Sequence, residues 1–213
     1  SSAIQSSEII VLALPSQSIR DVITKNKSSF NKNHIIVNVS KGIEIDTLMT
    51  VSEVINDVLD GQHKSVVTLS GPSHAEEVIS GHPTTLVAAS NDFQSAEIIQ
   101  NLFATEKLRT YLNRDIRGVE LGGSMKNVIA IAAGICDGIG YGDNSKAALM
   151  TRGMMEITRL GEAMGARVKT FRGLSGYGDL IVTCLSKHSR NRKLGQLIGE
   201  GKTLEDVTSD MSM

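Results

Sequence analysis

One lysine lies inside an otherwise apolar, small-residue segment, where a charge is costly. Lys126 belongs to the run Leu121–Gly134, and in a helix it shares one narrow face with Gly122, Ala130 and Ala133. Burial disfavours the ammonium form and brings a lysine pKa towards neutrality, where the group exchanges protons with a substrate oxygen efficiently. Lys126 is therefore a candidate proton donor and acceptor. The alternative is a lysine whose stem packs while its head reaches water.

Two glycines precede this lysine by about one helical turn. Gly122 and Gly123 each cost a helix about 1 kcal/mol relative to alanine. Their presence predicts that a ligand ring or sugar approaches the helix closely at this point.

A polar cluster in the second half of the chain has the composition of a phosphate site. Ser189 is a natural helix N-cap, and Arg190 and Asn191 follow it in the first turn. A helix amino terminus offers free backbone donors and positive dipole, to which these two side chains add donors suited to phosphate oxygens. The alternative is a solvated basic face.

Asp179 ends a glycine-rich turn and precedes an apolar run. Two uses are open. The carboxylate orients the Lys126 ammonium and limits the depression of its pKa, or it caps the following helix.

The elements that position these residues alternate in the first half and are helical in the second. Short apolar runs predict strands, and helical spacing or length predicts helices between and after them. The predicted strands cover residues 9–14, 35–39, 66–69, 85–89 and 108–112, and the predicted helices cover 47–59, 93–103, 115–137, 145–164 and 190–198. Gly61 is expected to end the first of these helices.

This pattern indicates an α/β domain followed by an all-helical one. Strands that alternate with helices predict a parallel sheet, here a partial Rossmann-like domain over residues 1–114, and residues 115–213 form a partial all-helical substrate domain. Ligands of such sheets bind beside the carboxyl ends of the strands. Three hydroxyl-rich loops follow strands there: residues 15–17, 40–42 and 70–75.

Composition points to a small-molecule partner. The 213 residues carry a formal net charge of -1, which gives no electrostatic case for nucleic acid or an anionic membrane. No apolar run approaches membrane-spanning length, so stable membrane insertion is not expected. Two distant cysteines favour the cytoplasm over a disulfide framework, and the five histidines lack metal-ligand spacing.

The segment Gly138-Ile139-Gly140-Tyr141-Gly142 superficially suggests a dinucleotide loop. It follows a predicted helix and not a strand, and its third glycine is misplaced, so we reject that reading.

Taken together, six blocks of sequence resemble bacterial-type NAD(P)-dependent glycerol-3-phosphate dehydrogenase along nearly the whole chain. The blocks are Val39–Glu44, Ser70–Val78, Glu120–Val128, Asp137–Asn144, Gly173–Leu180 and Ser189–Arg192. The family begins with a strand and glycine-rich pyrophosphate loop and continues past the end seen here. The resemblance therefore implies a fragment that lacks both ends.

The resemblance also implies an activity and residue roles. The family interconverts sn-glycerol 3-phosphate and dihydroxyacetone phosphate with NAD or NADP, which supplies glycerophospholipid synthesis, and it is often dimeric. Lys126 is then the proton acceptor in oxidation. The residues implied around the substrate are Lys41, Gly71, Ser73, Asp179, Ser189, Arg190 and Asn191. Those implied to touch the cofactor are Lys41, Ala75 and Arg190.

Two other interpretations stay open from the sequence. One is a 6-phosphogluconate-dehydrogenase-like or ketopantoate-reductase-like enzyme acting on another small substrate, and the phosphate cluster at Ser189 argues against an unphosphorylated substrate. The other is a non-catalytic binding module.

Overall fold

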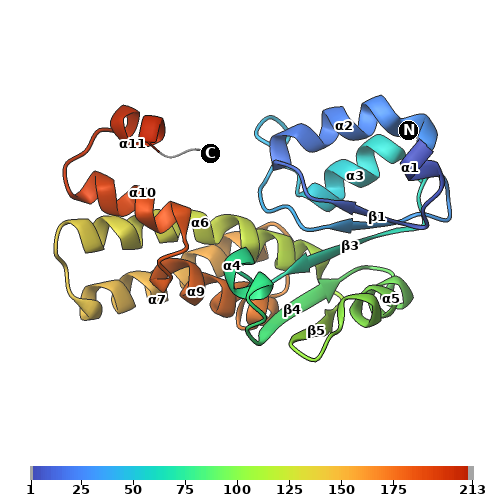
Figure 1. Ribbon diagram of the computed structural model, residues 1–213. Helices are drawn as coiled ribbons and strands as arrows, with labels where there is room; N and C mark the ends of the chain where they lie inside the picture. The colour runs from blue at the N-terminus through green and yellow to red at the C-terminus, as the bar shows by residue number, and fades with distance from the viewer. Residues whose placement is uncertain (1, 211–213) are drawn as a thin grey trace.

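A computed structural model describes residues 2–210, with side chains described for residues 2–207. Five strands form one sheet in the order β1-β2-β3-β4-β5 (Figure 1). They are β1 (Ile9–Leu12), β2 (Ile35–Asn38), β3 (Ser65–Ser70), β4 (Thr84–Ala89) and β5 (Leu108–Asn113). All five predicted strands are confirmed, with ends that shift by one or two residues.

The expectation of a wholly parallel sheet is wrong at one pairing. β1, β2 and β3 run parallel, and so do β4 and β5, but β4 is antiparallel to β3, with Ser70 opposite Val87. The link between β3 and β4 contains only one short helix, α4 (Ala75–Ile79). A parallel connection usually carries a longer crossover helix, whereas antiparallel strands can be joined by a short link. The link over residues 71–83 has no such crossover helix, which is consistent with the antiparallel pairing.

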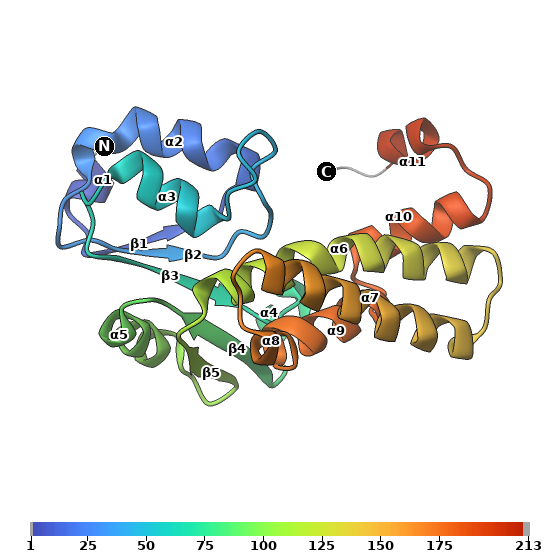
Figure 2. The same cartoon turned by 180° about the vertical axis from the view of Figure 1, so that it is seen from behind.

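Helices cover both faces of the sheet. α2 (Ile19–Asn26) and α3 (Val51–Leu59) lie on one face, and α5 (Phe93–Phe103) lies on the other (Figures 1 and 2). Alternate residues of β2 enter the two cores: Ile36 packs with the α2 and α3 side, and Val37 with the α5 side. The short elements of this half are α1 (Ser2–Gln5), η1 (Ser16–Ser18) and η2 (Lys27–Ser29).

The start of α3 differs from the prediction, and its end at Leu59 agrees with it. The helix begins at Val51 and not at residue 47, because Thr50 and Glu53 form a capping box that sets its first turn. Asp60 is the C-cap, in the left-handed conformation with φ 45°, and Gly61 follows it with φ 76°.

The second half is helical, and no strand follows Asn113 in the described chain, as predicted. Its elements are α6 (Ile116–Gly138), α7 (Asp143–Ala163), α8 (Val168–Phe171), the π-helical turn η3 (Leu174–Gly178), α9 (Asp179–Leu185), α10 (Arg190–Gly199) and α11 (Leu204–Asp210). The segment from Gly138 to Gly142 is the turn from α6 to α7, as its position after a helix predicts. The domain division after residue 114 stays a prediction.

The prediction that no apolar run approaches membrane-spanning length is wrong for α6. Within the described residues it is the one helix long and apolar enough to cross a membrane, and half of its most apolar stretch is buried inside the protein. It lies against α7, α9 and α10 (Figure 2). The burial is that of a core helix in a globular domain.

Glycines bring α6 and α10 into backbone contact. A Cβ built on Gly134 would lie 1.9 Å from the Arg192 carbonyl oxygen, and one on Gly195 would lie 1.9 Å from that of Ile131. Gly138 meets the end of α10 in the same way, so the two helices run parallel. This contact places the amino terminus of α10 alongside the middle of α6, just beyond Lys126.

Candidate functional site

Lys126 points into the protein and not into water. Its residue is 6% exposed, and its Nζ donates hydrogen bonds to Asp179 Oδ1 and to Thr183 Oγ1, the latter at 2.7 Å. Gly122, Ala130 and Ala133 are buried on the same helix, as predicted. Burial lowers the pKa of Lys126 to about 8, with a further contribution from the nearby positive charge of Lys41. Lys126 can therefore hold or release a proton near neutral pH.

Asp179 joins two lysines that lie far apart in the sequence. One carboxylate oxygen accepts from Lys126 and the other accepts from Lys41 Nζ at 2.6 Å. Asp179 is 1% exposed and is the first residue of α9, whose N-cap is Gly178. Of its two predicted uses, the structure supports orientation of the ammonium, and the capping alternative is wrong.

Thr183 is a member of this cluster that the sequence analysis missed. Its hydroxyl accepts from Lys126 Nζ and donates to the Asp179 carbonyl oxygen at 2.5 Å. The signal was available, since Thr183 stands four residues after Asp179 and therefore on the same face of a helix.

The loop after β3 brings three predicted residues beside the cluster. The Gly71 carbonyl oxygen accepts from Lys41 Nζ at 3.4 Å and from Ser73 Oγ at 3.2 Å. Gly71 has φ 144°, and a Cβ there would lie 3.1 Å from the Thr85 carbonyl oxygen, so glycine is needed at this turn. Ala75 is exposed as the first residue of α4.

The predicted phosphate residues lie at the amino terminus of α10. Ser189 is its N-cap, as predicted, and its side chain accepts from the Arg192 backbone N–H at 3.2 Å. Arg190 is exposed and Asn191 is half-buried, and in the described chain neither side chain bonds to the lysine cluster. The His188 ring lies 6.1 Å from that of His74, which brings this terminus to the loop after β3.

The interpretation of Gly122 and Gly123 as room for a ligand is wrong. A Cβ on Gly122 would lie 2.6 Å from the Ser175 carbonyl oxygen, and one on Gly123 would lie 2.9 Å from Ser70 Oγ. The close approach is therefore made by the protein itself. These glycines let η3 and the end of β3 pack directly on α6.

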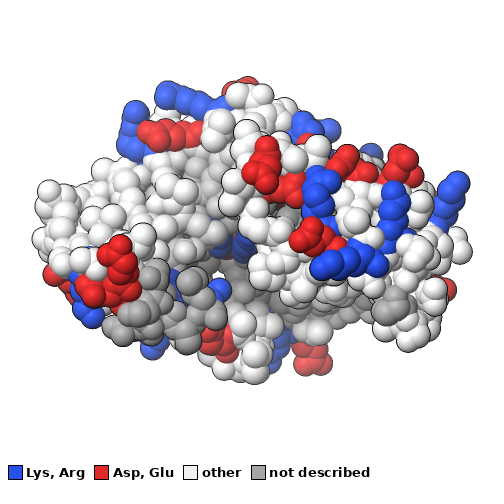
Figure 3. Space-filling model, turned by 90° about the horizontal axis from the view of Figure 1, so that it is seen from above, with Lys and Arg blue, Asp and Glu red and all other residues white. Residues whose placement is uncertain are grey.

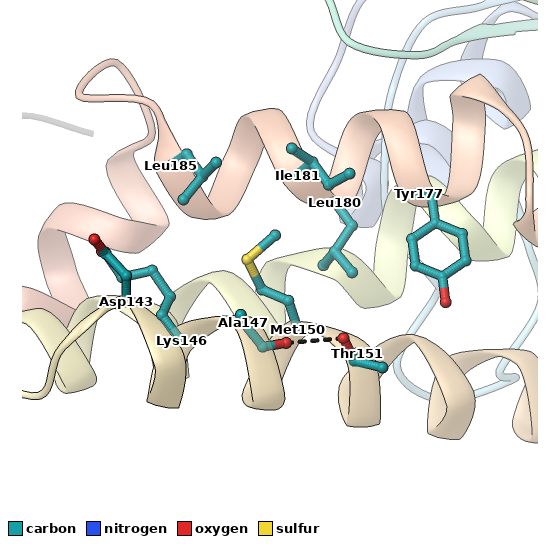
Figure 4. A pocket seen from close by; sticks show the side chains of 9 residues that line it. All are labelled: Asp143, Lys146, Ala147, Met150, Thr151, Tyr177, Leu180, Ile181 and Leu185. Carbon is teal, nitrogen blue, oxygen red and sulfur yellow. Dashed lines mark hydrogen bonds between the residues drawn. The ribbon is translucent and has the colours of Figure 1, made fainter.

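An apolar cavity of about 520 Å³ lies apart from the lysine cluster, between α7 and α9 (Figure 4). Met150 enters it from α7, and Leu180 and Ile181 enter it from α9. Leu180 follows Asp179, and successive helical side chains point about 100° apart. The polar cluster and this cavity thus use different faces of α9. Among the described residues, no group of three or more His, Cys, Asp or Glu gathers as a metal site.

The fold and the polar cluster define a class of protein. A largely parallel sheet ends in hydroxyl-rich loops, a helical half packs against that edge, and a buried lysine of lowered pKa lies between them. From above, the surface is hollowed between the two halves, with basic side chains inside the hollow (Figure 3). Such an arrangement is suited to proton transfer at a ligand held at the sheet edge.

The chain belongs to the NAD-dependent glycerol-3-phosphate dehydrogenase family. Residues 1–96 match the family's N-terminal part, described as NAD-dependent glycerol-3-phosphate dehydrogenase N-terminus, and residues 115–213 match its C-terminal part. The resemblance drawn from the sequence is therefore confirmed.

Curated relatives and solved structures agree with this membership. A protein of Clostridium perfringens (strain 13 / Type A) named glycerol-3-phosphate dehydrogenase (NAD(P)+) is 56% identical over 99% of this chain. One of the same name from Thermoanaerobacter sp. (strain X514) is 54% identical over 99% of the chain. The chain spans 63% of the length of each. The crystal structure of glycerol-3-phosphate dehydrogenase from Coxiella burnetii matches with a TM-score of 0.95 and 36% identity, covering all of this chain and 64% of that one.

The family implies a nicotinamide cofactor, and the described residues fit a part of it. Ser70 Oγ and His74 Nε2 are buried without a hydrogen-bond partner in the described chain, and both lie at the carboxyl end of β3. Unpaired buried polar atoms at this edge, beside Lys41, suit a polar ligand. These residues fit a polar group of the cofactor beside the sheet edge.

Proposed function

We propose that the protein interconverts sn-glycerol 3-phosphate and dihydroxyacetone phosphate by hydride transfer with NAD or NADP, and so feeds glycerophospholipid synthesis. Family membership supports the reaction, and one observation carries the chemistry: Lys126, buried and with a pKa of about 8, is held by Asp179 and Thr183. A bound nicotinamide supplies the hydride chemistry.

Lys126 is the proton-transfer residue of this proposal. In reduction its ammonium donates a proton to the developing alkoxide of the substrate, and in oxidation the neutral amine accepts the hydroxyl proton. A positioned proton donor contributes about 10²- to 10⁴-fold in rate. Asp179 and Thr183 hold the nitrogen in one orientation, and Lys41 adds a second positive charge on the same carboxylate.

The remaining residues bind and orient. Gly71, Ser73 and Lys41 surround the reacting end of the substrate. Ser189, Arg190 and Asn191 bind its phosphate at the amino terminus of α10, where unpaired backbone donors favour an anion. A group gripped there is remote from the reacting carbon and contributes orientation. Lys41, Ala75 and Arg190 contact the cofactor.

The setting of the protein is part of the proposal. We place it in the cytoplasm, since Cys136 and Cys184 are both free thiols. Burial raises the pKa of the Cys184 thiol to about 11, so this cysteine serves packing. A homodimer is proposed from the family resemblance alone.

The proposal is tested by assay of the full-length protein, meaning this chain with whatever segments its gene encodes on either side. We expect dihydroxyacetone phosphate to drive oxidation of NADH or NADPH, whereas dihydroxyacetone without phosphate does not. The full-length Clostridium perfringens relative is the positive control. Turnover with the unphosphorylated ketone alone would favour another reductase. Binding of dihydroxyacetone phosphate without turnover would favour the binding module.

A further inference from the structure

A second buried charge on α6 lies outside the cluster described above. Glu120 stands six residues before Lys126 and is 5% exposed. Its Oε1 accepts from Asn38 Nδ2 at 3.0 Å, from the Ser52 backbone N–H at 3.0 Å and from Thr68 Oγ1 at 2.8 Å. Its Oε2 accepts from Ser52 Oγ at 2.6 Å. Four hydrogen bonds around one side chain satisfy the oxygens of a buried carboxyl group.

These partners come from three elements of the sheet domain. Asn38 ends β2, Thr68 lies in β3, and Ser52 lies in the first turn of α3. Burial raises the pKa of Glu120, while the hydrogen bonds from Ser52 and Thr68 act against that rise. A charge buried at such a cost is retained only where its hydrogen bonds compensate it. Glu120 therefore joins the helical half to the sheet at a defined register.

The Asn38 amide carries this link towards Lys41. Asn38 Nδ2, which donates to Glu120, also donates to the Ser40 carbonyl oxygen at 3.3 Å. Asn38 Oδ1 accepts from the Ser40 backbone N–H at 2.9 Å. Ser40 directly precedes Lys41, so the side chain that Glu120 holds also sets the backbone before this lysine.

α6 holds the other side of Lys41 as well. The Gly42 backbone N–H donates to Ser124 Oγ at 2.9 Å, and that hydroxyl donates to the Glu120 carbonyl oxygen at 2.7 Å. The residues before and after Lys41 are thus both tied to one turn of α6. The same helix carries Lys126 less than two turns further on.

We propose that Glu120 is a positioning residue whose carboxyl group sets Lys41 against Asp179, and thereby against Lys126, through Asn38. This inference rests on the proposed function where it is tested by enzyme kinetics, and it is independent of that function where it is tested by lysine labelling. It explains why a costly carboxylate is buried at the junction of the two halves.

The proposal has a consequence for the titration of Lys126. The titratable groups that face Lys126 are Asp179, Lys41 and Cys184. The positive charge of Lys41 lowers the Lys126 pKa, so a Lys41 that moves away lets that pKa rise. Loss of the Glu120 link is expected to move the midpoint of the pH profile of reduction upwards from about 8.

A double-mutant cycle in the full-length protein tests whether Glu120 acts through Lys41. Glu120→Gln keeps the shape and removes the charge. We expect it to lower kcat/KM about tenfold in the wild-type background and less than about twofold in the Lys41→Met background. Equal losses in both backgrounds would overturn the proposal, because a merely structural role lowers activity regardless of Lys41.

A second readout does not depend on activity. Lys41 released from Asp179 should react with an amine-acylating reagent about threefold faster, or more, by peptide mass spectrometry. Exposed Lys64 is the internal reference. Ser52→Ala is the matched control, since it removes a Glu120 partner that does not lead to Lys41, and it should leave Lys41 labelling unchanged. Unchanged labelling in Glu120→Gln would also overturn the proposal.

Two further controls separate the possible failures. If Glu120→Gln does not fold, judged by thermal unfolding, Asn38→Ala cuts the same link and leaves Glu120 with its Ser52 and Thr68 donors. If the wild type does not turn over dihydroxyacetone phosphate, the proposed function fails, while the labelling experiment still decides the role of Glu120.

Discussion

The two halves of α6 differ in what they bury. The first half buries two charges, Glu120 and Lys126, each matched by partners from other elements. The second half packs Gly134 and Gly138 against the backbone of α10. The first half buries polar groups at a cost in stability, and one of them is the candidate proton-transfer residue. The second half gains contact area with α10 and sets the position of its amino terminus. Substitutions in the first half of α6 should therefore lower mainly turnover, whereas substitutions in the second half should lower mainly the free energy of unfolding.

The largest effect is expected in the first half. Lys126→Met keeps much of the side-chain volume and removes the exchangeable proton, so kcat should fall about 10²- to 10⁴-fold. Cofactor affinity should stay near the wild-type value. Steady-state kinetics in both directions, with a fluorescence titration of NADH, measure the two quantities. Exposed Lys64→Met is the control, and near-normal turnover in Lys126→Met would remove the proton-transfer role.

The pH dependence of the rate tests the role of Lys126, in the same half of α6. The Lys126 pKa lies at about 8, below its ordinary value. Reduction needs the protonated form, so its rate should be constant below that pH and fall about tenfold per unit above it. Oxidation needs the neutral amine and should rise through the same range to a plateau. Profiles of kcat in both directions check these opposite signs. Slopes of the same sign in the two directions would contradict the assignment.

The second half should respond in stability. Gly134→Ala gains about 1 kcal/mol of helix propensity, but its Cβ meets a backbone oxygen that cannot move aside. Overpacking of this kind costs about 1 to 3 kcal/mol, so a net loss in the free energy of unfolding is expected. Urea denaturation measures it. Gly142→Ala, in open space, is the control, and equal stability of the two variants would show that α6 and α10 can separate at no cost.

The smallest effect is expected at the amino terminus of α10, which lies alongside the middle of α6. Arg190→Lys keeps the charge but loses the planar fork that binds phosphate in a bidentate way. The KM for dihydroxyacetone phosphate should rise about tenfold, or about 1.4 kcal/mol, with little change in kcat. Inhibition by inorganic phosphate should weaken in parallel. An unchanged KM would contradict the phosphate assignment.

Local sequence was sufficient to predict most helices and strands and one candidate catalytic residue, Lys126. The five strands, the long helices and the Ser189 cap follow from interactions between residues a few positions apart, so spacing and capping residues predict them. Lys126 could be singled out because the cost of burying a charge is visible in its apolar neighbours. The start of α3 was missed because the capping box at Thr50 was not recognised in the sequence.

The tertiary structure decided how distant residues meet. Lys41 and Asp179 are 138 positions apart, and only the tertiary arrangement of α6, α9 and the loop after β2 brings both lysines onto one carboxylate. The reversal of β4 depends on how it pairs with β3, and the close contact at Gly122 depends on which backbone packs against it. Spacing describes neighbours along the chain, whereas hydrogen bonds and close contacts between elements depend on three-dimensional packing, which no local pattern specifies.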